Sequence, residues 1–304
     1  MARKDSRARR RKGLRLTPPG AVPGTVLAVP DTAPLSIRVF GYGPDAFAED
    51  RLDDPRAVAG YLGRWPVTWV DVVGLSDADR ILALGEVFGL HRLALEDVVS
   101  LHQRAKVDQY PDHLFVVVRM LNPLEHYETE QISLFLGPNY VLTFQERVGD
   151  CFEPVRDRIR TAKGRLRSAG ADYLAYALLD SVIDGYFPVV EDLGERLEEI
   201  EEKALRLPDA ASIGAIRQVK RDLIAMRRAV WPIREVVNSL IRDAGELVGN
   251  ETRIYLRDCY DHAVQIMELF EAYRETSSDL VNLYLSSLSN RMNETMKVLT
   301  VIAT

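Results

Sequence analysis

The sequence predicts an α+β protein, in which a mixed β-sheet is sandwiched by helices (α/β/α) and followed by long helices, including a very long stalk helix. Two observations predict this. Short β-branched and aromatic runs alternate with helical patterns up to about residue 145. From about Phe152 onward the strand patterns stop and only helical patterns remain. The 304 residues, 47% of them hydrophobic and 28% charged, suffice for one large or two ordinary globular domains.

The chain opens with a basic arm. Residues 1–16 hold eight Lys or Arg against one Asp, so that with a formal charge of -6 for the whole chain the remainder carries about -13. The arm lacks the apolar core of a secretory signal. We expect residues 1–20 to form a disordered, solvated arm, with contact to anionic lipid as the alternative. An acidic body without interleaved aromatic and basic residues argues against a nucleic-acid partner.

An α/β domain is predicted over residues 21–165. Two stretches in it, Asp77 to Phe88 and Leu93 to Val99, have apolar residues at helical spacing. A hairpin turn is predicted at Gly137-Pro138-Asn139. The strand candidate at residues 113–121 is almost continuously apolar, which is typical of a central strand covered on both faces. The predicted strands are SIRVF (36–40), VTWVDVV (67–73), HLFVVVRML (113–121), QISLFLG (131–137) and YVLTF (140–144).

Long, paired, acidic helices that pack with the α/β domain are predicted over residues 166–248. The stretch VEDLGERLEEIEEKALRL (190–207) has more acids than pairing within the helix can neutralise. We interpret it as a solvated face; attraction of cations is the functional alternative. Breaks at Pro208-Asp209 and at residues 245–250 divide the region after Phe152 into three long helical stretches.

A stalk helix is predicted over residues 249–304. Residues 251–304 contain no Gly or Pro and can form one helix about 80 Å long at 1.5 Å per residue. The last seven residues, VLTVIAT, are apolar, and we interpret them as the start of a first transmembrane helix. The alternative is a soluble helix whose apolar end docks on the core. No other stretch approaches the roughly 20 apolar residues of a membrane span.

The candidate ligands are acids and one histidine. Glu96 and Asp97 are neighbours on a short predicted helix, so their side chains diverge by about 100° and serve different partners. Asp258, Asp261 and His262 share one helix face at i, i+3 and i+4, a spacing that can present oxygen and imidazole ligands to a cation. Judged from the residues alone, ordinary surface charges or caps, and a satisfied buried imidazole for His262, are the favoured interpretation.

Enzyme chemistry has no support in the sequence. There is no P-loop, GxSxG, HExxH or dinucleotide fingerprint, and we expect no small organic substrate. Cys151 and Cys259 lack the spacing of a zinc module or a disulfide framework, which indicates a reduced, intracellular setting. On the stalk, uncharged residues recur every three or four positions along one face, as in a coiled-coil seam: Asn282, Leu285, Ser289, Asn293, Met296 and Thr300.

Four blocks resemble successive blocks of the CorA family of magnesium and cobalt transporters, in family order, from about residue 65 to the last residue. They are LEDVVSLHQRAKVDQYPDHLF, TFQERVGDCFEPVRDRIR, ADYLAYALLDSVIDGYF and YLSSLSNRMNETMKVLTVIAT. The resemblance implies that the chain is the cytoplasmic, metal-sensing and gating part of a channel in the cell (inner) membrane. That channel would conduct Mg²⁺ and also Co²⁺. It implies a funnel-shaped subunit of a homopentamer, attached to the membrane through C-terminal helices that this chain lacks. The alternatives are a zinc transporter of the same superfamily and a soluble coiled-coil scaffold protein.

The resemblance also implies two metal sites and a pore. An ion would bridge Asp97 of one subunit and Asp258 of the next, and a second site would use Glu96 with contributions from Asp180 and His262. Mg²⁺ prefers oxygen ligands and keeps most of its waters, so acids that contact it partly through water are suitable. Bound Mg²⁺ would stabilise the closed state.

The uncharged face of the stalk would line the pore, where an apolar ring stops a hydrated ion by excluding water. In this interpretation Asn293 forms a polar ring, and Met296 and Leu299 form the constriction beyond it. Asn282 differs from the acid found at this position in close relatives. The implied pore residues are Asn282, Leu285, Ser289, Asn293, Met296 and Leu299.

Overall fold

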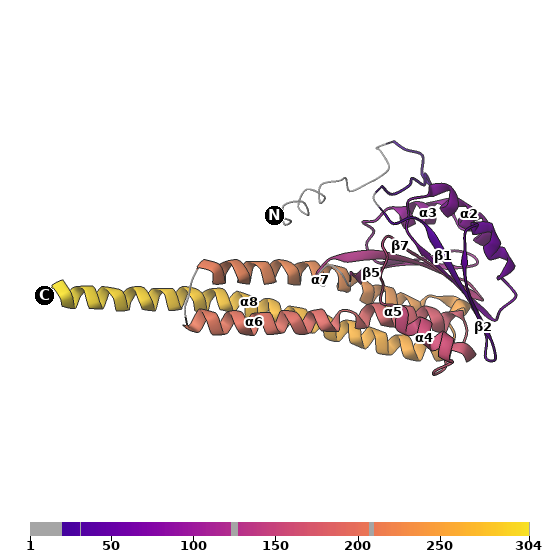
Figure 1. Cartoon of the computed structure of the whole chain (residues 1–304). Coiled ribbons are helices and arrows are strands. Elements are labelled where there is room, and N and C mark those ends of the chain that lie inside the picture. The colour runs from indigo at the N-terminus through magenta and orange to yellow at the C-terminus, as the bar shows by residue number, and fades with distance from the viewer. Residues whose placement is uncertain (1–19, 31, 123–126, 207–209, 304) are drawn as a thin grey trace.

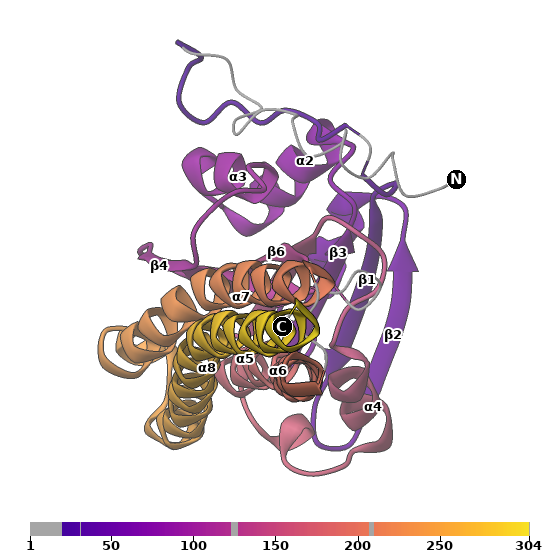
Figure 2. The same cartoon turned by 90° about the vertical axis from the view of Figure 1, so that its left-hand side faces the viewer.

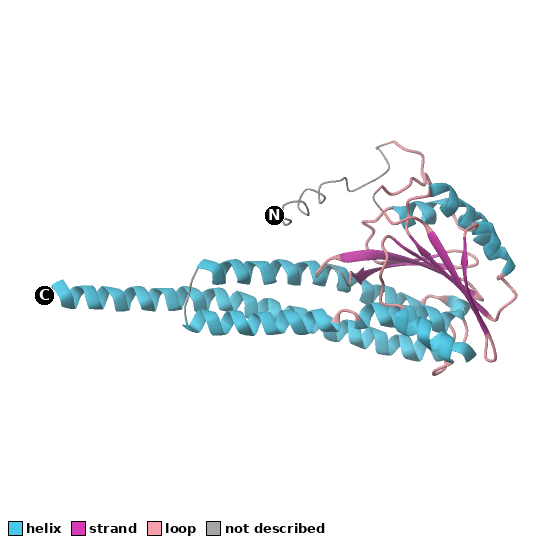
Figure 3. Cartoon of the chain, viewed as in Figure 1, coloured by secondary structure: helices cyan, strands magenta, loops and turns pink. Residues whose placement is uncertain are grey.

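The computed structural model describes residues 20–30, 32–122, 127–206 and 210–303. The predicted basic arm therefore lies outside the described residues apart from Gly20, as does the predicted break at Pro208-Asp209. Figure 1 shows a compact head that contains the sheet and, extending from it, a bundle of long helices. Figure 3 shows the same division by secondary structure: every strand lies in the head, and the extension is helical.

The described residues form one seven-stranded sheet with the order β2-β1-β3-β7-β6-β5-β4. All neighbouring pairs are antiparallel except β3 and β7, which run parallel, so the sheet is mixed as predicted. The hairpin between β6 and β7 closes through a hydrogen bond from Gly137 N to Tyr140 O. The strands are β1 (Ser36–Tyr42), β2 (Phe47–Leu52), β3 (Val67–Val73), β4 (Lys106–Gln109), β5 (Leu114–Leu121), β6 (Thr129–Leu136) and β7 (Tyr140–Gln145).

The sequence predicts five of these strands and misses the two at the edges. β2 has the sequence FAEDRL and is mostly exposed, and β4 has only four residues, KVDQ. Edge strands are often short and charged, which discourages pairing with other chains, and such sequences lack the alternating apolar pattern that identifies a half-buried strand.

Helices cover both faces of the sheet, which confirms the predicted sandwich (Figure 2). On β5, Val116 and Val118 contribute to one core, whereas Phe115 and Val117 contribute to the other. α2 (Ala78–Phe88) and α3 (Arg92–Val99) cover the second face. α2 begins where the Asp77 side chain accepts a hydrogen bond from Arg80 N and ends at Gly89, whose φ of 64° is a left-handed conformation natural to glycine.

The other face packs against α4 (Glu153–Thr161), α5 (Ala171–Asp184) and the long helices α6 (Phe187–Arg206), α7 (Ala210–Arg242) and α8 (Asn250–Ala303). Short 3₁₀ turns lie at Pro55–Gly60, Leu166–Ser168 and Gly245–Leu247. The first of the three predicted helical stretches is in fact three helices, α4, α5 and α6. It breaks after Thr161, where Ala162 has a φ of 53°, and again at Gly185, where the chain turns into α6.

The two long helices that flank the stalk do not share a charge. α6 has seven acids against three Lys or Arg, as predicted, but α7 has seven Lys or Arg against two acids. The expectation of paired acidic helices is therefore wrong for α7. The acid-rich run 190–207 dominates the composition of the region and hides the basic helix that follows it.

α8 is a single helix of 54 residues, which confirms the predicted stalk. Its first half is held by α5, α6 and α7 through buried residues such as Leu256, Ile266 and Phe270. Its last turns extend past the ends of α6 and α7 (Figure 1). Within the described residues, no helix has a window both long and apolar enough to cross a membrane.

Candidate functional site

Asp180, Asp184 and His262 bring ligand atoms together between α5 and α8. One ligand atom from each residue lies within 4.8 Å of the other two. His262 Nδ1 is 3.4 Å from Asp184 Oδ1, and His262 Nε2 is 4.0 Å from Asp258 Oδ2. The two helices position these groups by the same rule, since Asp180 and Asp184 on α5, like Asp258 and His262 on α8, are four residues apart and share a face.

The inner part of this cluster, where Asp180 is half-buried and Cys259 is buried, is crowded with negative charge. Burial raises the pKa of Asp180, and the charge of Asp184 raises it further. The Cys259 thiol donates a hydrogen bond of 3.4 Å to Asp180 Oδ1, and its own pKa is raised by burial. Phe187 packs edge-on against the His262 ring at 5.6 Å, so the imidazole has an apolar wall on one side and acids on the other.

The outer part of the cluster is open to solvent. The side chains of Asp184 and Asp258 are 54% and 67% exposed, whereas that of His262 is 33% exposed. Exposed carboxylates beside half-buried ones suit a cation that keeps part of its water shell. The structure thus brings together three predicted residues, Asp180, Asp258 and His262, and adds Asp184. Asp261 is exposed and does not belong to the cluster.

The predicted residues Glu96 and Asp97 lie on α3, on the opposite face of the sheet from α8 (Figure 2). Asp97 accepts a hydrogen bond of 2.7 Å from Gln103 Nε2 and forms an ion pair of 2.7 Å with Lys106 Nζ. Glu96 accepts a hydrogen bond of 2.6 Å from the backbone N–H of Gly24. The neighbours therefore have different partners, as their divergent directions require, and within one chain neither joins the α5–α8 cluster.

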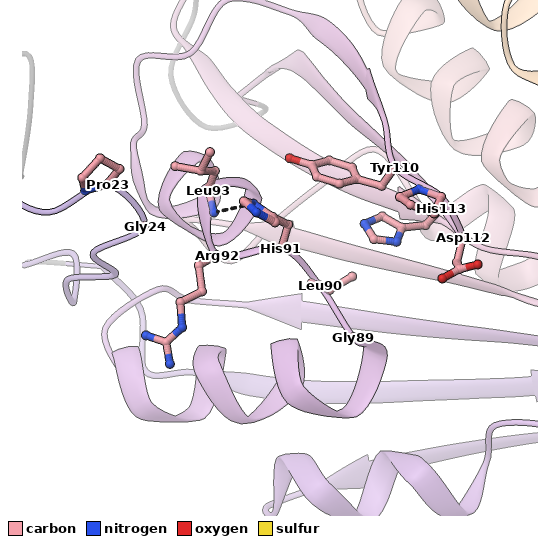
Figure 4. A pocket seen from close by; sticks show the side chains of 11 residues that line it. Pro23, Gly24, Gly89, Leu90, His91, Arg92, Leu93, Tyr110, Asp112 and His113 are labelled. Carbon is pink, nitrogen blue, oxygen red and sulfur yellow. Dashed lines mark hydrogen bonds between the residues drawn. The ribbon is translucent and has the colours of Figure 1, made fainter.

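A cavity of about 710 Å³ lies at the start of α3 (Figure 4). Its wall includes Gly24, whose backbone N–H donates to Glu96. It also includes three stacked rings, in which the Tyr110 ring centre lies 5.7 Å from that of His91 and 4.9 Å from that of His113. Burial lowers the pKa of His113. Among the described residues, no predicted site residue lines this cavity, and Asp112 is the one acid in its lining, so we do not place a cation site there.

All six predicted pore residues are exposed in the single chain. An α-helix turns by about 100° per residue, so residues 282, 285 and 289 are centred about 140° from Ser277, Leu280 and Tyr284, which are buried beside α6 and α7. The uncharged face thus points away from the rest of its own chain. Leu285, Met296 and Leu299 on it are 53–60% exposed, and Val298, Val301 and Ile302 in the last turns, which extend past α6 and α7, are 58–76% exposed.

Comparison with known proteins identifies the family. The family model described as "CorA-like Mg2+ transporter protein" matches residues 66–304. The "Cobalt/magnesium transport protein CorA" of Thermotoga maritima is 40% identical over 303 residues, which covers 99% of this chain and 85% of the relative. The "Putative metal ion transporter YfjQ" of Bacillus subtilis is 33% identical over 236 residues, 78% of this chain and 73% of the relative.

Solved structures share the fold at low sequence identity. The complete CorA magnesium transporter of Methanocaldococcus jannaschii gives a TM-score of 0.71 at 19% identity, over 88% of this chain and 81% of that one. The ZntB cytoplasmic domain of Vibrio parahaemolyticus gives a TM-score of 0.69 at 13% identity, over 84% of this chain and 99% of that one. The family match covers most of the chain, and the Thermotoga relative matches nearly all of it. The chain therefore belongs to the CorA-like Mg²⁺ transporter family, a family of ion transporters and not of enzymes.

Proposed function

We propose that the chain is the cytoplasmic metal-sensing and gating part of a channel that carries Mg²⁺, and also Co²⁺, across the cell (inner) membrane. Family membership and the name of the Thermotoga relative support the cargo. The observation that carries the sensing role is the cluster of Asp180, Asp184 and His262 with Asp258 beside it, where acids crowd at a partly open surface and form no ion pair with a Lys or Arg among the described residues.

In this proposal the channel is a homopentamer in which one α8 from each subunit surrounds the pore. The uncharged face of α8 supports this, because its described residues are exposed and turned away from α6 and α7, and a symmetric ring would bring five copies of the face together. Asn293 forms a polar ring, and Met296 and Leu299 form a dry constriction when the ring is closed. The pore residues remain those predicted: Asn282, Leu285, Ser289, Asn293, Met296 and Leu299.

Mg²⁺ bound between subunits stabilises the closed ring. Asp97 and Asp258 lie on opposite faces of one sheet, so an ion that bridges them must join two chains. Two carboxylates that face each other repel unless a divalent ion lies between them, which couples ion binding to closure. A second site uses Glu96 of one chain with Asp180 and His262 of the cluster.

Weak sites are sufficient for this switch. Moving a two-state equilibrium from 1:99 to 99:1 needs about 5.5 kcal/mol, which over roughly ten sites in a pentamer is about 0.5 kcal/mol each. A site that binds only the closed state contributes about 0.4 kcal/mol when the ion concentration equals its dissociation constant. Sites tuned near the Mg²⁺ concentration of the cell can therefore close the ring collectively.

The double variant Asp97→Asn/Asp258→Asn tests the proposal. It should lose most of the protection that Mg²⁺ gives the chain against trypsin, and in the full-length channel it should reduce inhibition by internal Mg²⁺. Asp261→Asn is the matched control, because Asp261 is an exposed acid of α8 outside the cluster. Unchanged protection and inhibition in the double variant would reduce both acids to ordinary surface charges.

A zinc transporter of the same superfamily is the second candidate, because the imidazole of His262 suits Zn²⁺ better than Mg²⁺. Flux of Mg²⁺, Co²⁺ and Zn²⁺ through the full-length protein in vesicles distinguishes the two. Transport of Zn²⁺ with no transport of Mg²⁺ would overturn the proposed cargo.

A further inference from the structure

The outer faces of α6 and α7 carry rows of opposite charge. On α6, Glu191, Glu195 and Glu198 are exposed at spacings of four and three residues. No ion pair within the described residues involves any of the three. The row has the 3.5-residue period of a helix face that meets another helix.

A complementary row runs along α7. Arg217, Arg221 and Arg228 are exposed and share one helix face, at spacings of four and seven residues. In the part of the chain that the structure describes, none of them pairs with an acid. Ile224 and Trp231 complete the row, and each is 39% exposed. Trp and Arg are enriched at protein interfaces, and the guanidinium groups of Arg227 and Arg234 lie 5.4 and 4.7 Å from the centre of the Trp231 ring.

Both rows point away from their own chain. At about 100° per residue, the centre of each row lies about 150° around its helix from the buried residues that pack on α8 and the rest of the bundle, such as Leu193 and Leu197 on α6 and Val219 and Leu223 on α7. The two rows are therefore not arranged to neutralise each other within one subunit, and an ion pair of 3.3 Å that does join the two helices, between Arg196 of α6 and Asp222 of α7, uses other residues.

A ring of copies would bring the two rows together. In the view along α8 (Figure 2), α7 lies on one side of the stalk and α6 on the other. The uncharged face of α8 lies about 140° from the residues buried beside α6 and α7, so when that face meets the axis, both helices lie outside the ring of stalks. Around the ring α6 and α7 then alternate, and α7 of one copy comes next to α6 of its neighbour.

The register of the rows agrees with such a ring. α6 ends and α7 begins at the same level along α8 (Figure 1). At 1.5 Å per residue from that end, Glu198 lies at about 12 Å and Arg217 at about 10 Å, whereas Glu195 and Arg221 both lie at about 16 Å. Rotation about an axis parallel to the stalk leaves these levels unchanged. Acid and base therefore meet at equal heights without any sliding of one chain against the other.

We propose that α7 of each subunit docks against α6 of the neighbouring subunit through these two rows, with Arg217 facing Glu198, Arg221 facing Glu195 and Arg228 close to Glu191. The partner is a second copy of this chain. The inference rests on the proposed ring, but it concerns an outer contact that neither the metal sites nor the pore requires. In this contact the basic row of α7 meets an acidic partner that it does not meet within its own chain.

Cysteine cross-linking of the 304-residue chain in Mg²⁺ tests this contact. The double variant Glu195→Cys/Arg221→Cys should form, on mild oxidation, a ladder of covalent species up to five chains. The matched control is Glu191→Cys/Arg217→Cys, whose positions differ in level by about 12 Å and should give about tenfold less ladder. The native Cys151 and Cys259 are half-buried and buried, and either single variant measures their background.

Charge reversal supplies a second readout at the same positions. Glu195→Arg alone and Arg221→Glu alone should each weaken association of the chain about tenfold in sedimentation, because like charges then face each other. The double swap should restore it. An oligomeric chain whose matched pair gives no more ladder than the control, or whose double swap is not restored, would overturn the docking and leave the ring intact. A full-length protein that is monomeric in detergent would overturn both.

Discussion

Lys106 Nζ lies 2.7 Å from a carboxylate oxygen of Asp97. The same ammonium contacts Asp108 at 2.5 Å. Burial alone would lower the pKa of Lys106, but hydrogen bonds to Asp108 and Asp97 raise it, so the lysine remains charged. The acid that we place at the intersubunit metal site is thus already paired with a cation of its own chain, and an incoming divalent ion must displace this cation or share the carboxylate with it.

Lys106→Gln should therefore strengthen Mg²⁺ binding. The ion pair is partly exposed, and pairs of this kind contribute up to about 1 kcal/mol, so the Mg²⁺ concentration that gives half-maximal protection from trypsin should fall about two- to fivefold. Lys163→Gln removes the same charge at an exposed position and is the control. Equal shifts in the two variants would mean that only net charge matters and that Lys106 does not compete for Asp97.

Arg156 holds two buried acids together at the join between sheet and helices. It donates 2.8 Å hydrogen bonds to Asp71 and Asp150, and all three side chains are at most 5% exposed. Arg156→Met should lower the free energy of unfolding by about 3–5 kcal/mol, because it leaves buried carboxylates without a counter-charge. Urea denaturation measures the change.

Arg160 offers the matched control on the same helix. It also pairs with acids, Glu49 among them, but its side chain is 29% exposed and its partners are partly solvated. Arg160→Met should therefore cost about 1 kcal/mol or less. A similar loss in both variants would show that the buried network is no more important than a surface one.

The stability of the head should depend on pH through Glu130. Burial raises the pKa of Glu130 from 4.5 to about 7, although two backbone N–H groups, of Glu146 and Arg147, donate to its Oε1 at 2.9 Å. Because the folded chain holds this proton more tightly than the unfolded chain, the contribution of Glu130 to stability is greatest in acid. It falls as the pH rises from about 4.5 to about 7, by up to about 3 kcal/mol.

Glu130→Gln removes this titration and keeps an oxygen for the two backbone donors. Thermal unfolding of both proteins is followed from pH 5 to pH 8. The melting temperature of the unmodified chain should fall with rising pH by more than that of the variant, because only the unmodified chain has the Glu130 titration. Glu201→Gln, at an exposed position of α6, should leave that fall in place. A variant that keeps the full slope would place the titrating group elsewhere.

Elements with strong local patterns are predictable from the sequence. The apolar runs of β3, β5 and β7 fix their strands, Asp77 and Gly89 mark the ends of α2, and the absence of Gly and Pro predicts α8. The edge strands β2 and β4 are not predictable in this way, because neither has a continuous buried face and therefore neither has an apolar pattern. The basic character of α7 is visible in its residues but is obscured by the acidic run before it.

The candidate site is only half predictable, because its residues come from distant parts of the chain. Helical spacing finds that Asp258 and His262 share a face, and the same rule applied to Asp180 would have found Asp184. That α5 meets α8, or that Lys106 reaches Asp97, follows from tertiary packing, which periodicity does not encode. The resemblance to the CorA family supplied Asp180, and it also suggested pairing Asp97 with Asp258, which stays a prediction.

The final prediction concerns the constriction. Met296→Ser or Leu299→Ser should make the closed full-length channel leak, because a small polar side chain lets water, and then hydrated Mg²⁺, remain where a dry apolar ring excluded it. Both side chains are about 60% exposed in the single chain, so neither substitution removes a contact that holds the subunit together. The leak is measured as Mg²⁺ uptake into vesicles at an internal Mg²⁺ concentration that closes the unmodified channel.

Lys297 is the control for this measurement. It is an exposed neighbour on the same helix, turned about 100° from Met296, and it belongs to no part of the uncharged face. Lys297→Ser should leave the closed channel tight. If it leaks as much as Met296→Ser, then the face that includes Asn293 and Met296 does not line the pore, and the stalk must be rotated in the ring. The α6–α7 contact, whose position depends on that rotation, would then have to be abandoned with it.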